Sequence, residues 1–373
     1  MLDMRVRPPR FIAVSRDAHA WPAGYADSMG AELLPNTPEH LDRLLAADVD
    51  VLPMFQFSHH RNSTLLTTTT TAATTRVGHP LRGLVPLLQT ADVAFANLEC
   101  PLSTRGRPTK VDQYYRAAPR YARHLSESGI DVVSLANNHA FDFGEVAFDD
   151  TRRALRRYGV QFCGAGRDLA AARAPAIVSR HEASVAFLAY AIVADPASFA
   201  DAEFSGIAPF STELATEDIR SARRRVDRVV VSIHWGAEGE AVPRQSMRRA
   251  AHSLIRAGAD VVAGHHPHRF GSIEVIDGRP VFYSLGNIVF GHTHEHWGHT
   301  AVARVRFAAR GAPQVELVPV ANTGAHAFSP EPLRGAAAQV LVTEIARLSA
   351  PFGTRIGFDE EREIGIVDLA ASS

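Results

Sequence analysis

Short, nearly continuous apolar runs rich in β-branched residues recur along the chain, and each is followed by a polar or Gly-rich turn. Runs of this length are typical of strands that are buried on both faces of a sheet. Seven runs fit this form: residues 10–19, 48–57, 91–100, 130–139, 184–191, 227–236 and 259–268.

The segments between these runs show the apolar spacing of amphipathic helices. Two of them end on Gly129 and Gly258, at the position where a helix commonly ends on a left-handed glycine. Strand, loop, helix and strand therefore repeat, which predicts an α/β layered fold. The predicted helices are residues 38–47, 120–129, 148–159 and 245–258.

The regions outside this repeat are predicted to be peripheral. We expect residues 1–45 to form an N-terminal extension, an extra strand–helix unit packed on the main domain of residues 46–330. The low-complexity run LLTTTTTAATT, residues 65–75, predicts a mobile loop. Residues 331–373 contain an amphipathic helix, LRGAAAQVLVTEIARLSA, and a short strand, EIGIVDL. This tail would act as a structural brace or as a contact in a homo-oligomer.

Composition and charge limit the class of protein. The 373 residues are 46% hydrophobic and 21% charged, which predicts a soluble protein with a well-formed core. The formal net charge of −1 argues against broad electrostatic binding to nucleic acid or anionic membrane. The two cysteines, Cys100 and Cys163, are too few for a Cys-based zinc framework. Because the amino terminus lacks a signal-peptide run and no stretch approaches the ~18 apolar residues of a membrane span, we expect a cytoplasmic protein.

Polar residues of the types that bind metals follow four of the predicted strands. Ligand and catalytic groups of open α/β sheets gather at the carboxyl ends of the strands. Metal-ligand residue types at four separate strand ends are more than a fold alone requires, so they indicate a site. These residues are Asn97 and Glu99, Asn137 to His139, His234, and His265 to His268.

Five stretches keep a common order and spacing over roughly two thirds of the chain: ANLECPLS, SLANNHAFDFG, GAGRDLAAARAP, SIHWGAEGEAVPRQ and the segment 258–290. In these stretches the sequence resembles the CapA family of bacterial capsule (poly-γ-glutamate) synthesis proteins, which is related to calcineurin-like metallophosphoesterases. The resemblance implies an α/β/β/α sandwich and a metal-dependent enzyme. It also implies a divalent metal cofactor, with two ions expected.

The Asn138-His139 pair emerges where the strand IDVVSLA ends. A carboxamide oxygen is a hard, neutral ligand for a divalent cation, and a neighbouring imidazole can donate a proton to a leaving group. An Asn-His pair serves as metal ligand and general acid in the superfamily, so the resemblance implies these roles for Asn138 and His139. Asp142 is close enough in sequence to orient His139, as carboxylates outside a ligand shell commonly do.

Glu99 and His234 are the predicted metal ligands from two other strands. A carboxylate after the strand VAFAN can bind one cation or bridge two, and phosphoesterases usually carry Asp there. A Trp-Gly break follows His234 and lets its imidazole face a shared cleft. Asn97, Asn137 and Asn287 are predicted to contact substrate.

The motif GHHPH, residues 264–268, carries one residue more than the Gly-His-x-His pattern of the phosphoesterases. His266 and His268 would point to the same face if the chain were extended. His265 would point the other way unless Pro267 bends the run. We therefore predict His266 and His268 as metal ligands and keep His265 as a candidate.

The first metal position departs from the family, whose members open with a strand ending in Gly-Asp. This chain reads Phe-Gln there, and Gln56 cannot supply the negative charge that helps to hold a cation. His59 or His60 is one replacement. Asp17 and His19, which imitate the phosphoesterase Asp-x-His, are another; otherwise one metal position is weak or lost. Mixed N and O ligands without thiolates suit Mn²⁺, Fe²⁺ or Zn²⁺.

Lys110 is the chain's single lysine and falls where CapA relatives tend to carry one. We assign it to the catalytic group, because its ammonium would suit a carboxylate or phosphate on the substrate. A solvated charge on a loop is the alternative. The run GHTHEHWGHT, residues 291–300, begins with the literal phosphoesterase signature, but GHHPH already supplies the closing motif. His292, His294, His296 and His299 are predicted to lie on a cleft-edge loop, where substrate contact, plain surface and a direct metal role are the alternatives.

These features favour a metal-dependent enzyme of the CapA/metallophosphoesterase type. It would hydrolyse, or transfer at, an amide or ester of an anionic substrate, small or oligomeric, such as a γ-glutamyl or peptide-like compound. Two alternatives stay open: a non-catalytic component that binds poly-γ-glutamate during assembly, and a redox enzyme with a dinuclear iron site.

Overall fold

The computed structural model describes residues 79–110, 114–181, 183–289, 298–307 and 313–370, together with three strands nearer the amino terminus. These strands are β1 (Arg10–Ser15), β2 (Ala31–Pro35) and β3 (Thr64–Thr69). They form one small sheet in which β1 runs parallel to β2 and antiparallel to β3. The strand predicted at the start of the chain is therefore confirmed.

The loop predicted at residues 65–75 is wrong for its first part, because residues 65–69 belong to β3. Threonine is β-branched, and a run of threonines favours an extended chain that packs well on a pleated surface. Low complexity indicated a loop, but the β propensity of the same residues prevailed. Residues 70–75 lie outside the described part of the chain.

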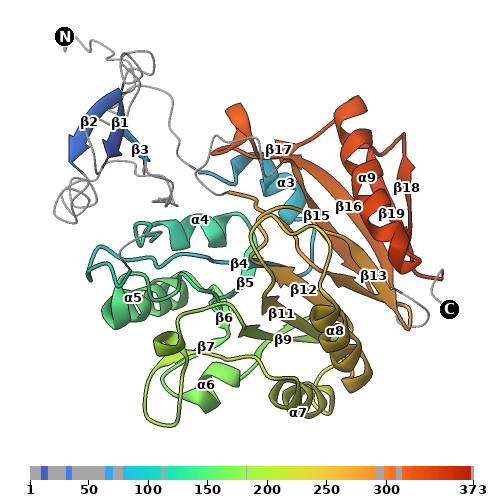
Figure 1. Ribbon diagram of the computed structural model, residues 1–373, viewed down its shortest axis with the longest axis horizontal. Helices are drawn as coiled ribbons and strands as arrows, with labels where there is room; N and C mark the ends of the chain where they lie inside the picture. The colour runs from blue at the N-terminus through green and yellow to red at the C-terminus, as the bar shows by residue number, and fades with distance from the viewer. Residues whose placement is uncertain are drawn as a thin grey trace.

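Two sheets of mainly parallel strands form the centre of the molecule (Figure 1). The smaller sheet, entirely parallel, contains β4 (Ala94–Asn97), β5 (Ile130–Ser134) and β6 (Gln161–Cys163). The larger sheet, in spatial order, contains β13 (Ile273–Ile276), β14 (Arg279–Phe282), β12 (Val261–His265), β11 (Arg228–His234), β9 (Ala183–Ala191) and β8 (Ala176–Arg180). Its four middle strands are parallel and its two edge strands antiparallel. Five of the seven predicted strands are confirmed here, and the run at 48–57 lies outside the described residues.

Helices flank both sheets (Figure 1). The main ones are α4 (Tyr121–Glu127), α5 (Gly144–Arg157), α7 (Thr212–Arg223) and α8 (Gln245–Ala257). α7 and α8 pack on each other and on strands of the larger sheet, whereas α4 and α5 contact the smaller one. Three predicted helices are confirmed, and the fourth, at 38–47, lies outside the described residues. Gly129 (φ 89°) and Gly258 (φ 117°) both adopt the left-handed conformation predicted for them.

A further sheet, nearer the carboxyl terminus, packs against the larger one. Its main strands are β15 (Thr300–Arg306), β16 (Gln314–Ala321), β19 (Ile364–Asp368) and β18 (Arg355–Asp359). Val261, Ile273 and Phe282 of the larger sheet share one apolar core with residues of this sheet and of α9 (Gly335–Ser349). The layers are therefore α7 with α8, two sheets, and α9, which confirms the layered α/β fold (Figure 1). The predicted C-terminal helix and strand correspond to α9 and β19, and β19 pairs with β16.

Short elements complete the described part of the chain. They are η1 (Arg82–Leu84), α3 (Val85–Leu88), β7 (Ala165–Gly166), α6 (Leu169–Arg173), η2 (Pro196–Ser198), β10 (Gly206–Ile207), η4 (Gly324–His326), β17 (Glu331–Pro332) and η5 (Ala350–Phe352).

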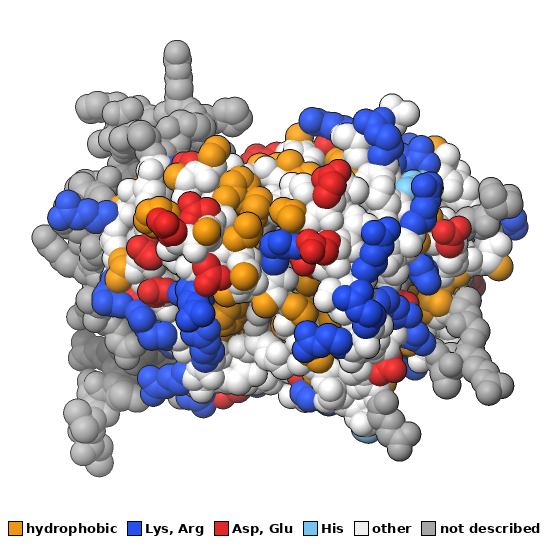
Figure 2. Space-filling view, turned by 90° about the horizontal axis from the view of Figure 1, so that it is seen from below, with side chains coloured by type: hydrophobic (Ala, Val, Ile, Leu, Met, Phe, Trp, Pro, Cys, Tyr) orange, Lys and Arg blue, Asp and Glu red, His pale blue; other side chains and the backbone are white. Residues whose placement is uncertain are grey.

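The surface carries charges of both signs. Figure 2 shows the face seen from below in Figure 1, where a hydrophobic patch lies among acidic and basic side chains. This mixture agrees with the formal net charge of −1. None of the described helices combines the length and the apolar character that a membrane crossing requires.

Candidate metal centre

The carboxyl ends of four strands meet at one edge of the two central sheets. In β4 and β5 the last residues, Asn97 and Ser134, lie opposite each other, and in β11 and β12 His234 lies opposite His265. Glu99 follows β4 and Asn138 follows β5 shortly after these positions. The structure therefore brings together the polar residues that the sequence placed at separate strand ends.

Glu99, His234 and His266 form the centre of this group. One ligand atom from each lies within 4.8 Å of the others, and all three residues are buried. His234 Nε2 is 3.6 Å from Glu99 Oε1, and His268 Nε2 is 3.9 Å from the same oxygen. Three imidazoles thus surround one carboxylate, an arrangement that a cation would stabilise.

Asn138 joins this cluster to His139. Its Oδ1 lies 2.8 Å from His234 Nε2, and its Nδ2 lies 3.1 Å from His139 Nε2. The carboxamide oxygen of Asn138 therefore faces His234, a predicted metal ligand, and is placed to bind the same cation.

Asp142 contacts His139 from the opposite side. Its Oδ2 lies 2.6 Å from His139 Nδ1 and accepts a hydrogen bond of 2.6 Å from the backbone N–H of Tyr115. Lys110 Nζ lies 2.8 Å from Asp142 Oδ1 and donates to the Asn138 carbonyl at 2.5 Å. Lys110 therefore neutralises a buried carboxylate within the site, a contact that the sequence did not predict. The contact of Tyr115 could not be predicted from the sequence either, because it is made by a backbone N–H, which every residue except proline carries.

The predicted substrate residues Asn97 and Asn137 hydrogen-bond within the site. Asn97 Nδ2 donates to Glu99 Oε2 at 2.8 Å, and Asn137 Nδ2 donates to Asn97 Oδ1 at 3.1 Å. Asn137 Oδ1 accepts from the His139 backbone N–H at 3.2 Å. In this arrangement the two amides hold Glu99 and His139 in place.

Asn287 fixes the position of His268. Its Oδ1 lies 3.0 Å from His268 Nδ1, and its backbone carbonyl accepts a hydrogen bond of 2.5 Å from Asn322 Nδ2. Such contacts orient an imidazole and leave its second nitrogen directed at the cluster. The sequence predicted Asn287 as a substrate contact and gave no signal for Asn322.

The chain turns within GHHPH instead of staying extended. β12 ends at His265, and His266 (φ 97°) and His268 (φ 63°) both have positive φ, which is uncommon for residues other than glycine. The extended geometry used to select His266 and His268 is therefore wrong, although both residues do reach the cluster. The ring centroid of His265, the third candidate of this motif, lies 6.2 Å from that of Phe95. Backbone strain of this kind costs on the order of 1–3 kcal/mol per residue and is concentrated at functional sites.

Burial sets the protonation states of the cluster. It raises the pKa of Glu99 to about 8, and the carboxylates of Asp142 and Glu238 add to this effect. Burial also lowers the pKa of His266 to about 3 and that of His268 to about 4, with repulsion between imidazoles as a further cause. It lowers the pKa of His234 well below its usual value. The imidazoles are therefore neutral at pH 7, the form in which histidine binds metals.

Buried side-chain atoms that lack hydrogen-bond partners indicate where a metal ion could bind. Within the described part of the chain, Glu99 Oε1 and His266 Nδ1 are buried and lack such partners. Leaving a buried polar group without a partner costs about 1–3 kcal/mol, and a bound cation would remove this cost for both atoms. Carboxylate, carboxamide and imidazole donors without thiolate match Mn²⁺, Fe²⁺ or Zn²⁺. The residues present therefore fit a divalent metal.

Eight candidate residues lie outside the described part of the chain, so their predicted roles stay predictions. They are Asp17, His19, Gln56, His59, His60, His292, His294 and His296.

A cavity of about 810 Å³ lies beside β6, and no residue of the metal cluster lines it. Arg152, Arg156 and Arg167 contribute to its wall together with apolar groups such as Phe162. Arg152 pairs with Asp149, and Arg167 pairs with Asp168. Because none of the lining residues belongs to the metal cluster, the cavity is separate from it.

Residues 56–292 match the family model described as bacterial capsule synthesis protein PGA_cap. The chain belongs to this family. Glu99, Asn138, His234 and His266 all fall within the matched region, and the resemblance to CapA proteins is confirmed.

Individual relatives agree with this assignment. The PGA biosynthesis protein CapA of Bacillus subtilis (strain 168) is 28% identical over 252 residues, covering 67% of this chain and 66% of that protein. The capsule biosynthesis protein CapA of Bacillus anthracis is 28% identical over 64% of this chain and 60% of its own length. A probable polyglutamine synthesis accessory protein of Mycobacterium tuberculosis is 33% identical over 53% of this chain and 55% of its own. The chain thus spans less than two thirds of the length of these curated relatives.

A looser structural similarity extends to the NAD nucleotidase NadN of Haemophilus influenzae. It has a TM-score of 0.36 and 11% sequence identity, and it covers 61% of this chain and 48% of that one.

Proposed function

We propose that this member of the PGA_cap family is a metal-dependent enzyme that hydrolyses, or transfers at, an amide or ester of an anionic substrate. The observation that carries the proposal is the buried group of Glu99, His234 and His266 with the His139–Asp142 pair beside it. Ligands for a cation and a group that exchanges protons thus lie in the same site, as metal-assisted hydrolysis requires.

The proposed metal ligands are Glu99, Asn138, His234, His266 and His268. Bound to these groups, a divalent cation supplies Lewis-acid chemistry and lowers the pKa of a coordinated water. We propose two ions, with one position completed by residues outside the described part of the chain. Because Glu99 is the single carboxylate among these five ligands, the loaded site would carry net positive charge and favour an anionic substrate.

His139 is the proposed general acid. Its Nδ1 is held by Asp142, so its Nε2 is the atom that exchanges a proton with the leaving group. Lys110 pairs with Asp142, and because its side chain is 25% exposed its ammonium can also contact an anionic group of the substrate. Asn97, Asn137 and Asn287 position Glu99, His139 and His268.

The γ-glutamyl class of substrate is supported by the two Bacillus relatives, which are named for PGA biosynthesis and for capsule biosynthesis. An amide bond flanked by carboxylates matches the charge of the proposed site. Both a polymer and a smaller peptide-like compound carry this chemistry.

A non-catalytic role in polymer assembly is the second candidate. It is favoured by the word "accessory" in the name of the Mycobacterium tuberculosis relative and by Gln56 at the usual aspartate position. In that case the chain would bind oligo-γ-glutamate without turnover.

One experiment separates the two candidates. The wild-type chain is loaded with Mn²⁺, Fe²⁺ or Zn²⁺ and assayed on oligo-γ-glutamate and on small γ-glutamyl amides, beside Glu99→Ala and His234→Ala. We expect metal-dependent cleavage by the wild type and loss of bound metal and activity in both variants. Tight binding of the oligomer without cleavage under any of these metals would support the assembly role instead.

A further inference from the structure

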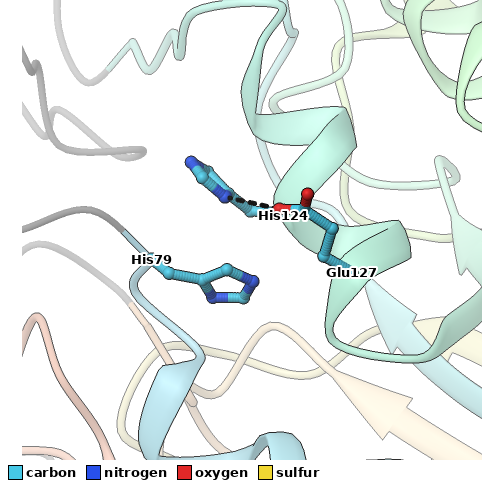
Figure 3. Close-up of side chains that lie close together, drawn as sticks. All are labelled: His79, His124 and Glu127. Atoms are coloured by element: carbon cyan, nitrogen blue, oxygen red, sulfur yellow. Dashed lines mark ion pairs between the residues drawn. The ribbon is translucent and has the colours of Figure 1, made fainter.

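A second group of metal-ligand side chains lies apart from the residues discussed above. It consists of His79, just before η1, together with His124 and Glu127 of α4. One ligand atom from each lies within 4.8 Å of the others. Figure 3 shows His79 reaching from the loop toward the two side chains of the helix.

The helix presents its two ligands side by side. His124 and Glu127 are three positions apart, a spacing that places side chains next to each other on a helix face. His124 Nδ1 lies 3.5 Å from Glu127 Oε2 (Figure 3). Glu127 Oε1 accepts a hydrogen bond of 2.7 Å from Arg123 Nε. Arg123 therefore anchors one carboxylate oxygen while the other faces the imidazole.

His79 closes the group from the other side. Its ring centroid is 4.6 Å from that of His124, and the two rings are tilted by 58°. Its Nε2 lies 3.5 Å from Ser128 Oγ, whereas its Nδ1 is buried and has no hydrogen-bond partner among the described residues. Burial lowers the pKa of both His79 and His124, so both rings are neutral at pH 7. Neutral imidazoles that pack together beside a carboxylate retain the lone pairs that bind metals.

We propose that His79, His124 and Glu127 form a second metal site, which binds Zn²⁺. Two imidazoles and one carboxylate are a common ligand set for zinc, and a water molecule would complete the fourth position. Bonds of about 2.0–2.1 Å in a tetrahedron separate the ligand atoms by roughly 3.4 Å. His124 and Glu127, at 3.5 Å, already match this spacing, so any contraction needed is at His79.

The ion would fasten the chain that precedes η1 to helix α4. His79 and His124 are 45 positions apart in sequence, so the link closes a long loop and restricts the unfolded chain. The ion would stabilise the fold through this link, whatever reaction the central cluster performs. The occupancy of this site does not depend on the proposed enzymatic function.

Zinc binding to the metal-stripped full-length chain tests the site. In the background Glu99→Gln/His234→Ala, which disables the central cluster, isothermal titration should still show one zinc ion bound per chain. Adding His124→Ala should weaken this binding by at least about 100-fold. Removing a group that only orients a ligand already weakens metal binding by about 10–100-fold, and removing the ligand itself should cost at least as much. Glu127→Gln, which keeps the side-chain shape, should also weaken it.

The matched control is His181→Ala in the same background. His181 Nε2 lies 3.2 Å from Asp92 Oδ1, a histidine–carboxylate pair on the surface that belongs to no ligand triad among the described residues. This variant should bind zinc as the background does. A background chain that binds no zinc, or a His124→Ala chain with unchanged affinity, overturns the proposal.

A crystal of the wild-type chain grown with Zn²⁺ covers the case in which these variants do not fold. Anomalous scattering at the zinc edge should show a peak between His79 and His124. A map at saturating zinc without that peak overturns the proposal.

Discussion

The Nδ1 atom of His139 lies 2.6 Å from the Oδ2 atom of Asp142, and both side chains are buried. The same Asp142 oxygen accepts the Tyr115 backbone N–H, so the carboxylate cannot rotate freely. An imidazole held at one nitrogen keeps a single tautomer and presents its other nitrogen in a fixed direction. That direction is toward Asn138, the proposed metal ligand.

Replacing Asp142 with asparagine should reduce catalysis without removing the metal. Asp142→Asn keeps the shape of the side chain but removes the charge that stabilises protonated His139. We expect kcat to fall about 100-fold, with KM and metal content little changed. Steady-state kinetics and metal analysis check this. Asp150→Asn, which alters a carboxylate paired with Arg105, is the control and should leave kcat unchanged.

Metal affinity should rise with pH through Glu99. The pKa of this carboxyl is raised to about 8 by burial in the metal-free chain, so the group is protonated at pH 6. A cation binds the carboxylate form and displaces the proton, so affinity should increase about tenfold per pH unit between pH 6 and 8, then level off. His266, with its pKa lowered to about 3, and His268, with its pKa lowered to about 4, are already neutral there and add no slope.

Glu99→Gln provides the control for this pH dependence. Glutamine has no proton to lose, so the variant should bind metal more weakly and with a nearly flat profile from pH 6 to 8. Calorimetric titrations at several pH values measure both. An undiminished slope in the variant would assign the titrating group to another residue.

Asn287 should matter for metal affinity more than for folding. Its contact with His268 Nδ1 orients a proposed ligand, and losing such a contact typically weakens metal binding about 10–100-fold. Asn287→Ala should therefore show this loss in a metal titration while the chain stays folded by circular dichroism. Unchanged metal affinity would remove His268 from the proposed ligand set.

The tight packing at Gly264 should make it intolerant of a side chain. A Cβ there would lie 2.1 Å from the Tyr283 carbonyl oxygen and 2.6 Å from Trp235 Nε1. Gly264→Ala should lower the free energy of unfolding by about 1–3 kcal/mol and displace the adjacent histidine turn. Gly357→Ala is the matched control, because a Cβ at Gly357 meets no atom within 4 Å. Urea denaturation compares the two variants, and equal stability would contradict the packing argument.

Much of the fold could be predicted because buried parallel strands leave a strong local signal. The runs that became β5, β9 and β11 are apolar along their length, and helix ends such as Gly258 have a defined backbone requirement. Most strands of the sheet that contains β15, β16, β19 and β18 were missed. Its strands, such as TAVARVR in β15, mix apolar with polar residues and pack against distant segments of the chain.

The candidate site was predicted as a set of residues but not as a geometry. The carboxyl ends of parallel strands lie at one edge of their sheet, so Glu99 and Asn138 could be grouped from sequence alone. His234 ends a strand of the larger sheet, and its approach to them depends on how the two sheets meet. The left-handed backbone of His266 and His268 could not, because tertiary packing imposes it against local preference. The contact between His79 and His124 joins residues far apart in sequence and carries no local pattern.

Anomalous scattering from crystals of the metal-loaded chain tests the central claim most directly. Data collected across the manganese, iron and zinc edges locate each ion and identify the element. The proposal predicts a peak enclosed by Glu99, Asn138, His234 and His266, at about 2.0–2.2 Å from their ligand atoms if the ion is zinc. A chain that is saturated with metal and active, yet shows no peak among these four residues, would contradict it.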